Sequence, residues 1–121
     1  MQAFVFDTYA IFEIISGNPD YEKYIQHPII VNPFIVSELC YNLLKTKEQK
    51  TANEYTDKYA KYSETIGKEI IKEAMNFRYK NREKKLSMTD CISYFQAKAL
   101  GIKFLTGDKE FENMPNVEFV K

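Results

Sequence analysis

The fold of this chain is decided by a stretch close to its start, Gln2-Ala3-Phe4-Val5-Phe6-Asp7. Its aromatic and β-branched residues favour a β-strand, and a short apolar run of this kind is typical of a buried strand. An aspartate that follows five strand residues directly is hard to explain by solubility alone. We therefore predict a buried strand over residues 2–6 that delivers the carboxylate of Asp7 to the edge of a sheet.

Three more short apolar runs predict strands, at residues 29–31, 102–105 and 117–120. Helices are predicted between the strands, over residues 8–15, 18–26, 32–46, 48–61, 65–81 and 87–101, with a short helical turn around Phe111. Two of these helices begin at an Asn-Pro pair, which offers an N-cap followed by proline at the first helical position. Because helices separate the strands, the order predicts an α/β fold, with three layers (α/β/α) and a central, mostly parallel β-sheet.

Size and composition fit one globular domain. The chain has 121 residues, of which 45% are apolar and 28% charged, and this composition argues against a disordered protein. Its longest apolar runs fall far short of the roughly 18 residues that a membrane span needs, and its start lacks the features of a signal peptide. We expect a single domain over residues 1–121, in a cytoplasmic protein that makes no membrane contact.

The overall charge gives no general attraction to nucleic acid, because the 17 basic and 17 acidic residues cancel. Nucleic acid would have to be bound by a local patch. One candidate patch has five cations within eight residues: Arg78, Lys80, Arg82, Lys84 and Lys85. The patch fits RNA contact, and it equally fits the solvated end of a helix, where cations complement the helix dipole. The two interpretations are compatible.

Cysteine and histidine offer little chemistry here. Cys40 and Cys91 lie far apart and outside any C-x-x-C arrangement, so no zinc or redox motif is present, and we expect buried structural thiols. His27 is the sole histidine, which excludes a multi-histidine zinc site, and in a predicted loop before Pro28 it is expected to be exposed and structural. The chemistry of a site must therefore come from carboxylates.

Four carboxylates are predicted to reach one edge of the sheet: Asp7, Glu38, Asp90 and Asp108. Two of them follow strands, one borders the buried stripe of the helix after the second strand, and one lies in the first turn of its helix. In open parallel sheets the ligand crevice lies beyond the carboxyl ends of the strands. Clustered carboxylates repel one another unless a cation offsets their charge. Oxygen ligands suit Mg²⁺ or Mn²⁺, which can activate water and neutralise charge on a phosphoryl group.

Each acid also has a structural interpretation. Asp90 matches the third helical position of a capping box that begins at Ser87. Asp108 would fit a polar turn after a strand, and Glu38 an exposed helix position. Asp7 is the acid with the weakest structural explanation, and the group of four points to a shared site more strongly than any one member.

The sequence resembles the PIN-domain family, especially the short ribonuclease toxins of toxin–antitoxin modules. The resemblance rests on four segments that span nearly the whole chain: residues 4–8, 37–39, 86–92 and 101–111. It implies an acidic core of Asp7, Glu38 and Asp90, with Asp108 as a fourth and looser ligand. It also implies a parallel sheet, homodimers, and a small antitoxin that covers the acidic groove.

Further details of the resemblance concern the neighbours of the acids. It implies that the hydroxyls of Thr8 and Thr106 lie near the metal and orient its ligands or a bridging water. The chain departs from the family at Tyr9, where a small residue is common, and at Cys91, where alanine is frequent. Residues 48–81 show no clear strand between their helices, whereas many relatives have one.

These observations predict a metal-dependent endoribonuclease that hydrolyses RNA phosphodiester bonds with Mg²⁺ or Mn²⁺, and the resemblance suggests the toxin of a toxin–antitoxin pair. The alternative is a PIN-like module that binds RNA or a protein without cutting. Phosphatases of the haloacid-dehalogenase type also place an aspartate after the first strand, but they need a second acid two residues later, where this chain has Tyr9.

Overall fold

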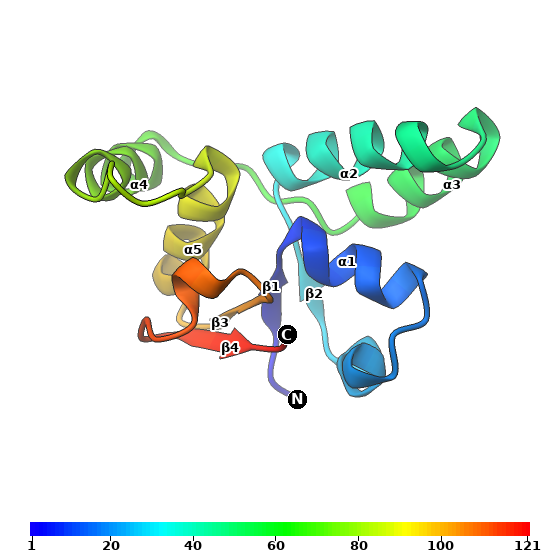
Figure 1. Cartoon of the computed structure of the whole chain (residues 1–121), viewed down its shortest axis with the longest axis horizontal. Coiled ribbons are helices and arrows are strands. Elements are labelled where there is room, and N and C mark those ends of the chain that lie inside the picture. The colour runs from blue at the N-terminus through cyan, green and yellow to red at the C-terminus, as the bar shows by residue number, and fades with distance from the viewer.

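The computed structural model describes residues 1–121 and contains one four-stranded sheet (Figure 1). Its strands are β1 (Phe4–Phe6), β2 (Ile29–Ile30), β3 (Lys103–Thr106) and β4 (Val117–Phe119). They lie in the order β2-β1-β3-β4, and every neighbouring pair is parallel. The predicted α/β fold is confirmed, and the sheet is parallel throughout rather than mostly parallel.

Helices lie on both sides of the sheet (Figure 1). They are α1 (Thr8–Ile15), α2 (Pro33–Thr46), α3 (Gln49–Ala60), α4 (Lys68–Lys80) and α5 (Met88–Leu100), with the 3₁₀ helices η1 (Pro19–Gln26) and η2 (Lys109–Phe111). In Figure 1, α4 and α5 lie on one side of β1, α1 and η1 lie on the other, and α2 and α3 run side by side at the top. No helix is both long and apolar enough to span a membrane.

The helices begin where the sequence provides caps. Asn18 accepts a hydrogen bond from the backbone N–H of Asp20 at 2.9 Å, and Asn32 accepts one from that of Ile35 at 3.0 Å. Proline follows both caps in the first helical turn, where its missing N–H costs nothing. At the far end of α5, Gly101 takes a left-handed conformation with φ of 70°, which glycine adopts without steric cost. These helix ends agree with the predicted ones.

The region between α3 and α4 differs in detail from its prediction. The helix expected from residue 65 begins at Lys68, because the chain before it is extended and pairs at Ser63 with the residue that follows β2. Val31 forms a single parallel bridge with Ser63, with hydrogen bonds of 3.0 Å from Val31 N to Tyr62 O and from Glu64 N to Val31 O. The sheet therefore gains one bridging residue at the β2 edge, where no strand was predicted.

The core supports the first strand as expected. Phe4, Val5 and Phe6 are at most 2% exposed and belong to one cluster of buried apolar residues. Cys91 is also buried, as predicted, whereas Cys40 is only half-buried. His27 is half-buried rather than exposed, because its ring packs edge-on against Phe4 with 5.1 Å between centroids. Residues 4–6 are thus held firmly, and this fixes the position of Asp7.

Candidate metal centre

Asp7 lies where β1 ends and α1 begins, and it is 2% exposed. Its Oδ1 atom accepts a hydrogen bond from the backbone N–H of Ala10 at 2.7 Å, so the side chain caps α1. Its Oδ2 atom accepts a hydrogen bond from the hydroxyl of Thr106. The carboxylate is therefore oriented from both sides, by the helix that follows it and by the neighbouring strand.

Asp108 reaches the same edge because β3 runs parallel to β1 and beside it. Thr106 ends β3, and its Oγ1 atom accepts a hydrogen bond from the backbone N–H of Asp108 at 3.1 Å. The Asp108 carboxylate in turn accepts one from the N–H of Glu110 at 3.0 Å and caps η2. Thr106 thus links two of the four acids, through its hydroxyl hydrogen to Asp7 and its oxygen to the Asp108 backbone.

Glu38 and Asp90 come from the helices α2 and α5. The hydroxyl of Thr8 donates a 2.9 Å hydrogen bond to Glu38 Oε1, so the residue next to Asp7 orients a second acid. The backbone N–H of Asp90 donates to Ser87 Oγ at 3.0 Å, which confirms half of the predicted capping box. Thr8 and Thr106 lie beside the acids, as the family resemblance implies.

All four acids line one hollow of about 410 Å³, which we call the acidic hollow. Its other lining residues are Thr8, Tyr9, Phe12, Asn42, Ser87 and Gly107. The sequence interpretation gave no role here to Asn42 or Phe12. Asn42 follows Glu38 by four residues on α2, and this spacing places the two side chains on one helix face. The spacing could therefore have predicted that Asn42 lies near the acids.

Two carboxylates of the acidic hollow, those of Asp7 and Asp90, resist ionisation. Burial raises the pKa of Asp7 from 3.8 to about 7; the hydrogen bonds from Thr106 and Ala10 oppose the rise, and the charges of Asp108 and Glu38 add to it. Burial is also the main cause that raises the pKa of Asp90. The negative charge of Asp7 and the nearby Asp108 carboxylate raise it further. A bound cation would reverse this effect, because it favours the charged form of each acid.

The donor set fits a hard divalent cation. It consists of carboxylate, hydroxyl and amide oxygens, which are the ligands preferred by Mg²⁺ and Mn²⁺. No three His, Cys, Asp or Glu side chains are yet grouped so as to hold one metal ion. The hydrogen bonds described above hold Asp7, Glu38 and Asp108 to their own neighbours, so an entering ion would have to draw these oxygens together.

Gly107 separates Thr106 from Asp108 and leaves no room for a side chain. A Cβ atom at this position would lie 2.7 Å from the backbone oxygen of Val120 and would also overlap the ring of Tyr9. We expect Gly107→Ala to lower the free energy of unfolding by about 1–3 kcal/mol, as is typical of overpacking, and to weaken Mn²⁺ binding by displacing Asp108. Chemical denaturation and calorimetric Mn²⁺ titration would measure the two effects.

Gly67→Ala is the control for this substitution. A Cβ atom there would meet nothing within 4 Å, and the backbone φ of −75° suits any residue. The loss of a glycine N-cap and the lower entropy of the unfolded chain nearly cancel, so we expect a change of about half a kcal/mol or less. Equal destabilisation by both substitutions would contradict the proposed close packing at Gly107.

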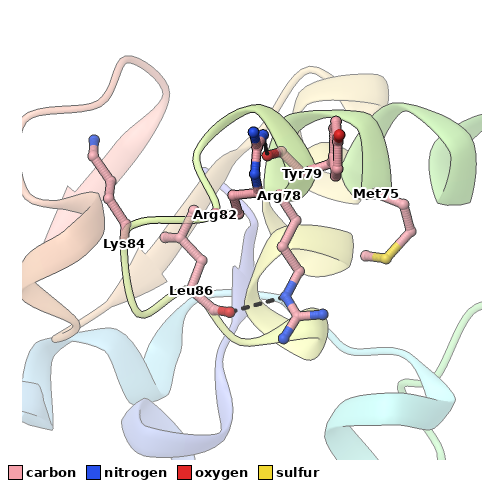
Figure 2. Close-up of a pocket in the computed structure, with 6 residues that line it drawn as sticks. All are labelled: Met75, Arg78, Tyr79, Arg82, Lys84 and Leu86. Carbon is pink, nitrogen blue, oxygen red and sulfur yellow. Dashed lines mark hydrogen bonds between the residues drawn. The ribbon is translucent and has the colours of Figure 1, made fainter.

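The five cations of the predicted RNA patch do not line the acidic hollow. Arg78 and Lys80 lie in the last turn of α4, where cations complement the helix dipole, as one of the two interpretations held. Arg82, Lys84 and Lys85 lie in the connection from α4 to α5. Of the five, only Arg78, Arg82 and Lys84 line a common cleft, shown in Figure 2, so the structure divides the patch into two parts.

The fold and the hollow define a class of protein, a parallel α/β domain with an acidic, oxygen-lined site at the carboxyl edge of its sheet. The PIN domain description matches residues 4–117, and the chain belongs to this family. PIN domains are typically metal-dependent nucleases. No curated protein matches the chain.

Solved structures share the fold over almost their whole length. A toxin-antitoxin complex from Klebsiella pneumoniae is 18% identical, with 95% of both chains covered and a TM-score of 0.74. VapBC2 from Rickettsia felis, bound to a DNA fragment from its promoter, is 16% identical, with 98% of both chains covered and a TM-score of 0.73. DNA-bound VapBC from Salmonella typhimurium is 16% identical, with 99% of this chain and 98% of that chain covered and a TM-score of 0.74. At these identities the likeness concerns the fold.

Proposed function

We propose that the protein is a metal-dependent endoribonuclease, a hydrolase of RNA phosphodiester bonds, formed by one domain over residues 1–121. The observation that carries the proposal is the meeting of Asp7, Glu38, Asp90 and Asp108, from four separate elements, in one hollow at the carboxyl edge of the sheet. Burying the carboxylate of Asp7 costs free energy, and a structural role as a helix cap could be filled by an uncharged residue.

The four acids would hold Mg²⁺ or Mn²⁺. When bound, such an ion lowers the pKa of water and neutralises charge on the phosphoryl group. The hydroxyls of Thr106 and Thr8 keep Asp7 and Glu38 turned towards the hollow, and the backbone N–H of Ala10 holds the other oxygen of Asp7. These donors lie on α1 and at the end of β3, so they orient the carboxylates, and an entering ion would draw the oxygens together.

The proposed partners follow from the family and its solved relatives. The relatives include toxin–antitoxin complexes, and two of them were crystallised with DNA. We propose that this chain is a toxin of the same kind, that it forms a homodimer, and that a small antitoxin covers the acidic hollow. Its substrate would then be an RNA in the cytoplasm, and no membrane would take part.

The competing function is a PIN-like module that binds RNA or protein without cutting it. Such a module has no need of four acids in one hollow, since the repulsion among them costs stability. The presence of all four acids therefore supports catalysis.

Cleavage of a labelled single-stranded RNA by the purified protein tests the proposal. We expect cleavage with Mg²⁺ or Mn²⁺ and none with excess EDTA, because the acids alone cannot neutralise the charge that develops on the phosphate. Restoring Mn²⁺ after EDTA treatment should restore cleavage. RNA binding without any metal-dependent cleavage would favour the non-catalytic module instead.

A further inference from the structure

A second hollow, of about 350 Å³, lies where α4 leads into α5, and we call it the basic cleft. Its lining residues are Met75, Arg78, Tyr79, Arg82, Lys84 and Leu86 (Figure 2). Three cations thus share one depression with an aromatic ring, and no acidic side chain lines it. A cleft of this composition suits an anionic ligand that also offers an aromatic surface.

Arg78 is fixed in position by the fold. Its Nε atom donates a 3.0 Å hydrogen bond to the backbone oxygen of Leu86, drawn as a dashed line in Figure 2. This bond uses one of the five N–H donors of the guanidinium group. The terminal nitrogens keep donors whose geometry matches two oxygens of one phosphate. Because the group is already oriented, a phosphate here would be bound at a lower entropic cost than by a mobile surface cation.

Arg82 and Tyr79 form a second fixed pair. The guanidinium carbon of Arg82 lies 4.4 Å from the centre of the Tyr79 ring, and Arg82 Nη1 donates a 2.9 Å hydrogen bond to the Tyr79 backbone oxygen. The Tyr79 side chain is still 66% exposed with this guanidinium in place, so a base has room to stack on its ring. Stacking on an exposed aromatic ring beside cations is the common way to bind single-stranded nucleic acid.

The basic cleft adjoins the acidic hollow along the chain. Leu86 lines the cleft and the next residue, Ser87, lines the hollow, where it caps the helix that carries Asp90. The two sites therefore meet at residues 86–87, and a strand of RNA that runs from the hollow past these residues would reach the cleft. Lys80 and Lys85 belong to the same charged segment but do not line the cleft.

We propose that the basic cleft binds one nucleotide of a single-stranded RNA, with its flanking phosphates on the cations that line the cleft and its base on Tyr79, next to the phosphodiester bond that is cut in the acidic hollow. This inference rests on the proposed function and names a subsite for its substrate. An acidic protein segment is the other ligand with suitable charge, but its carboxylate side chains offer no aromatic surface to Tyr79, and this favours RNA.

The test compares two pairs of substitutions that remove the same charge. Arg82→Ala/Lys84→Ala empties the cleft of two cations, and Lys80→Ala/Lys85→Ala removes two cations outside it. Arg78 is kept in both variants, so the bond to Leu86 survives. Binding of a short fluorescent single-stranded RNA is measured by anisotropy in EDTA, where no cleavage occurs, at several salt concentrations.

We expect the cleft pair to weaken RNA binding by at least about tenfold and to flatten the salt dependence by about 0.7 in log–log slope for each phosphate that is no longer neutralised. The pair outside the cleft should have a clearly smaller effect on both. Equal effects of the two pairs would overturn the proposal, because a diffuse positive surface would then explain the binding.

Tyr79 gives an independent measurement. Tyr79→Ala should weaken RNA binding by about tenfold, whereas Tyr79→Phe should retain it, because the stacking surface remains. Tyr41→Ala is the matched control, since Tyr41 is 64% exposed and also lies beneath a cation, Lys45 at 4.8 Å, but outside the cleft. Equal losses from Tyr79→Ala and Tyr41→Ala would contradict base stacking in the cleft.

Three further outcomes bear on this inference and on the proposed function. If wild-type protein cleaves RNA with Mn²⁺ but the cleft variants bind RNA normally, the cleft proposal is wrong and the nuclease proposal stands. If the wild-type protein binds poly-glutamate, and the cleft variants bind poly-glutamate more weakly but RNA as tightly as wild type, the cleft is a protein site. If the wild-type protein neither binds nor cleaves RNA, both proposals fail.

Discussion

Asp7→Asn should reduce metal-dependent RNA cleavage by about a thousandfold, equivalent to ~4 kcal/mol of lost transition-state stabilisation. The substitution replaces a carboxylate by a neutral amide of the same shape, so it removes a charge from the metal site and little else. Asp7 should show the largest effect of the four acids, because it is 2% exposed and its two oxygens are oriented by hydrogen bonds. A gel-based assay with Mn²⁺ and a 5′-labelled RNA would measure the loss.

The fold should survive this substitution. The amide oxygen of the new side chain can still accept the hydrogen bond from Ala10 and cap α1, and the amide N–H₂ group can donate to the hydroxyl of Thr106. Asp57→Asn is the matched control, because it makes the same chemical change at an exposed position on α3. We expect wild-type cleavage from Asp57→Asn, and equal cleavage by all three proteins would rule out Asp7 as a metal ligand.

The protein without metal should lose stability as pH rises from about 4 to about 7. The folded state holds a proton on Asp7 up to about pH 7, whereas the unfolded chain releases it near pH 3.8. Protons therefore favour the folded state within this window; the stabilisation is complete below about pH 4 and is lost as pH rises towards about 7. A pKa difference of about 3 units corresponds to ~4 kcal/mol, and the raised pKa of Asp90 acts in the same direction.

Urea denaturation at about pH 5 and about pH 8 in EDTA would measure this loss, and Asp7→Asn should show a smaller one. Saturating Mn²⁺ should restore stability at the higher pH, because the ion binds the folded protein with its acids ionised. If metal-free stability did not fall across this range, or if Mn²⁺ stabilised wild-type and Asp7→Asn proteins equally, the acids would not form the expected site.

Local sequence determined the order and type of the elements. The apolar run at residues 4–6 and the Asn-Pro pairs act within a few residues, through β-propensity and helix capping, so they predict structure without knowledge of the rest of the chain. The alternation of strands and helices then implied parallel pairing, because a parallel connection needs a crossover. Asp7 and Asp108 were found for the same reason, since Asp7 follows β1 directly and Asp108 lies two residues after the end of β3.

Tertiary structure alone decided how the acids are held and which side chains join them. The hydrogen bond from Thr106 to Asp7 joins residues 99 positions apart and exists because β3 lies beside β1, an order that no local pattern specifies. Asn42 lines the hollow only because α2 turns that face towards α1 and α5. The raised pKa of Asp7 has the same origin, because desolvation depends on every element packed around the carboxylate.

The charged segment at residues 78–85 shows the same division. The sequence identified five cations but treated them as one patch, since charge spacing along the chain does not reveal which side chains the backbone turns into a common cleft. The fold separates them, because Arg78 is held by the Leu86 backbone and Arg82 by Tyr79, whereas Lys80 and Lys85 remain outside. Sequence by itself determined which charges and strands the protein has, and long-range packing decided which of them meet, because hydrogen bonding and burial depend on neighbours that are distant in the chain.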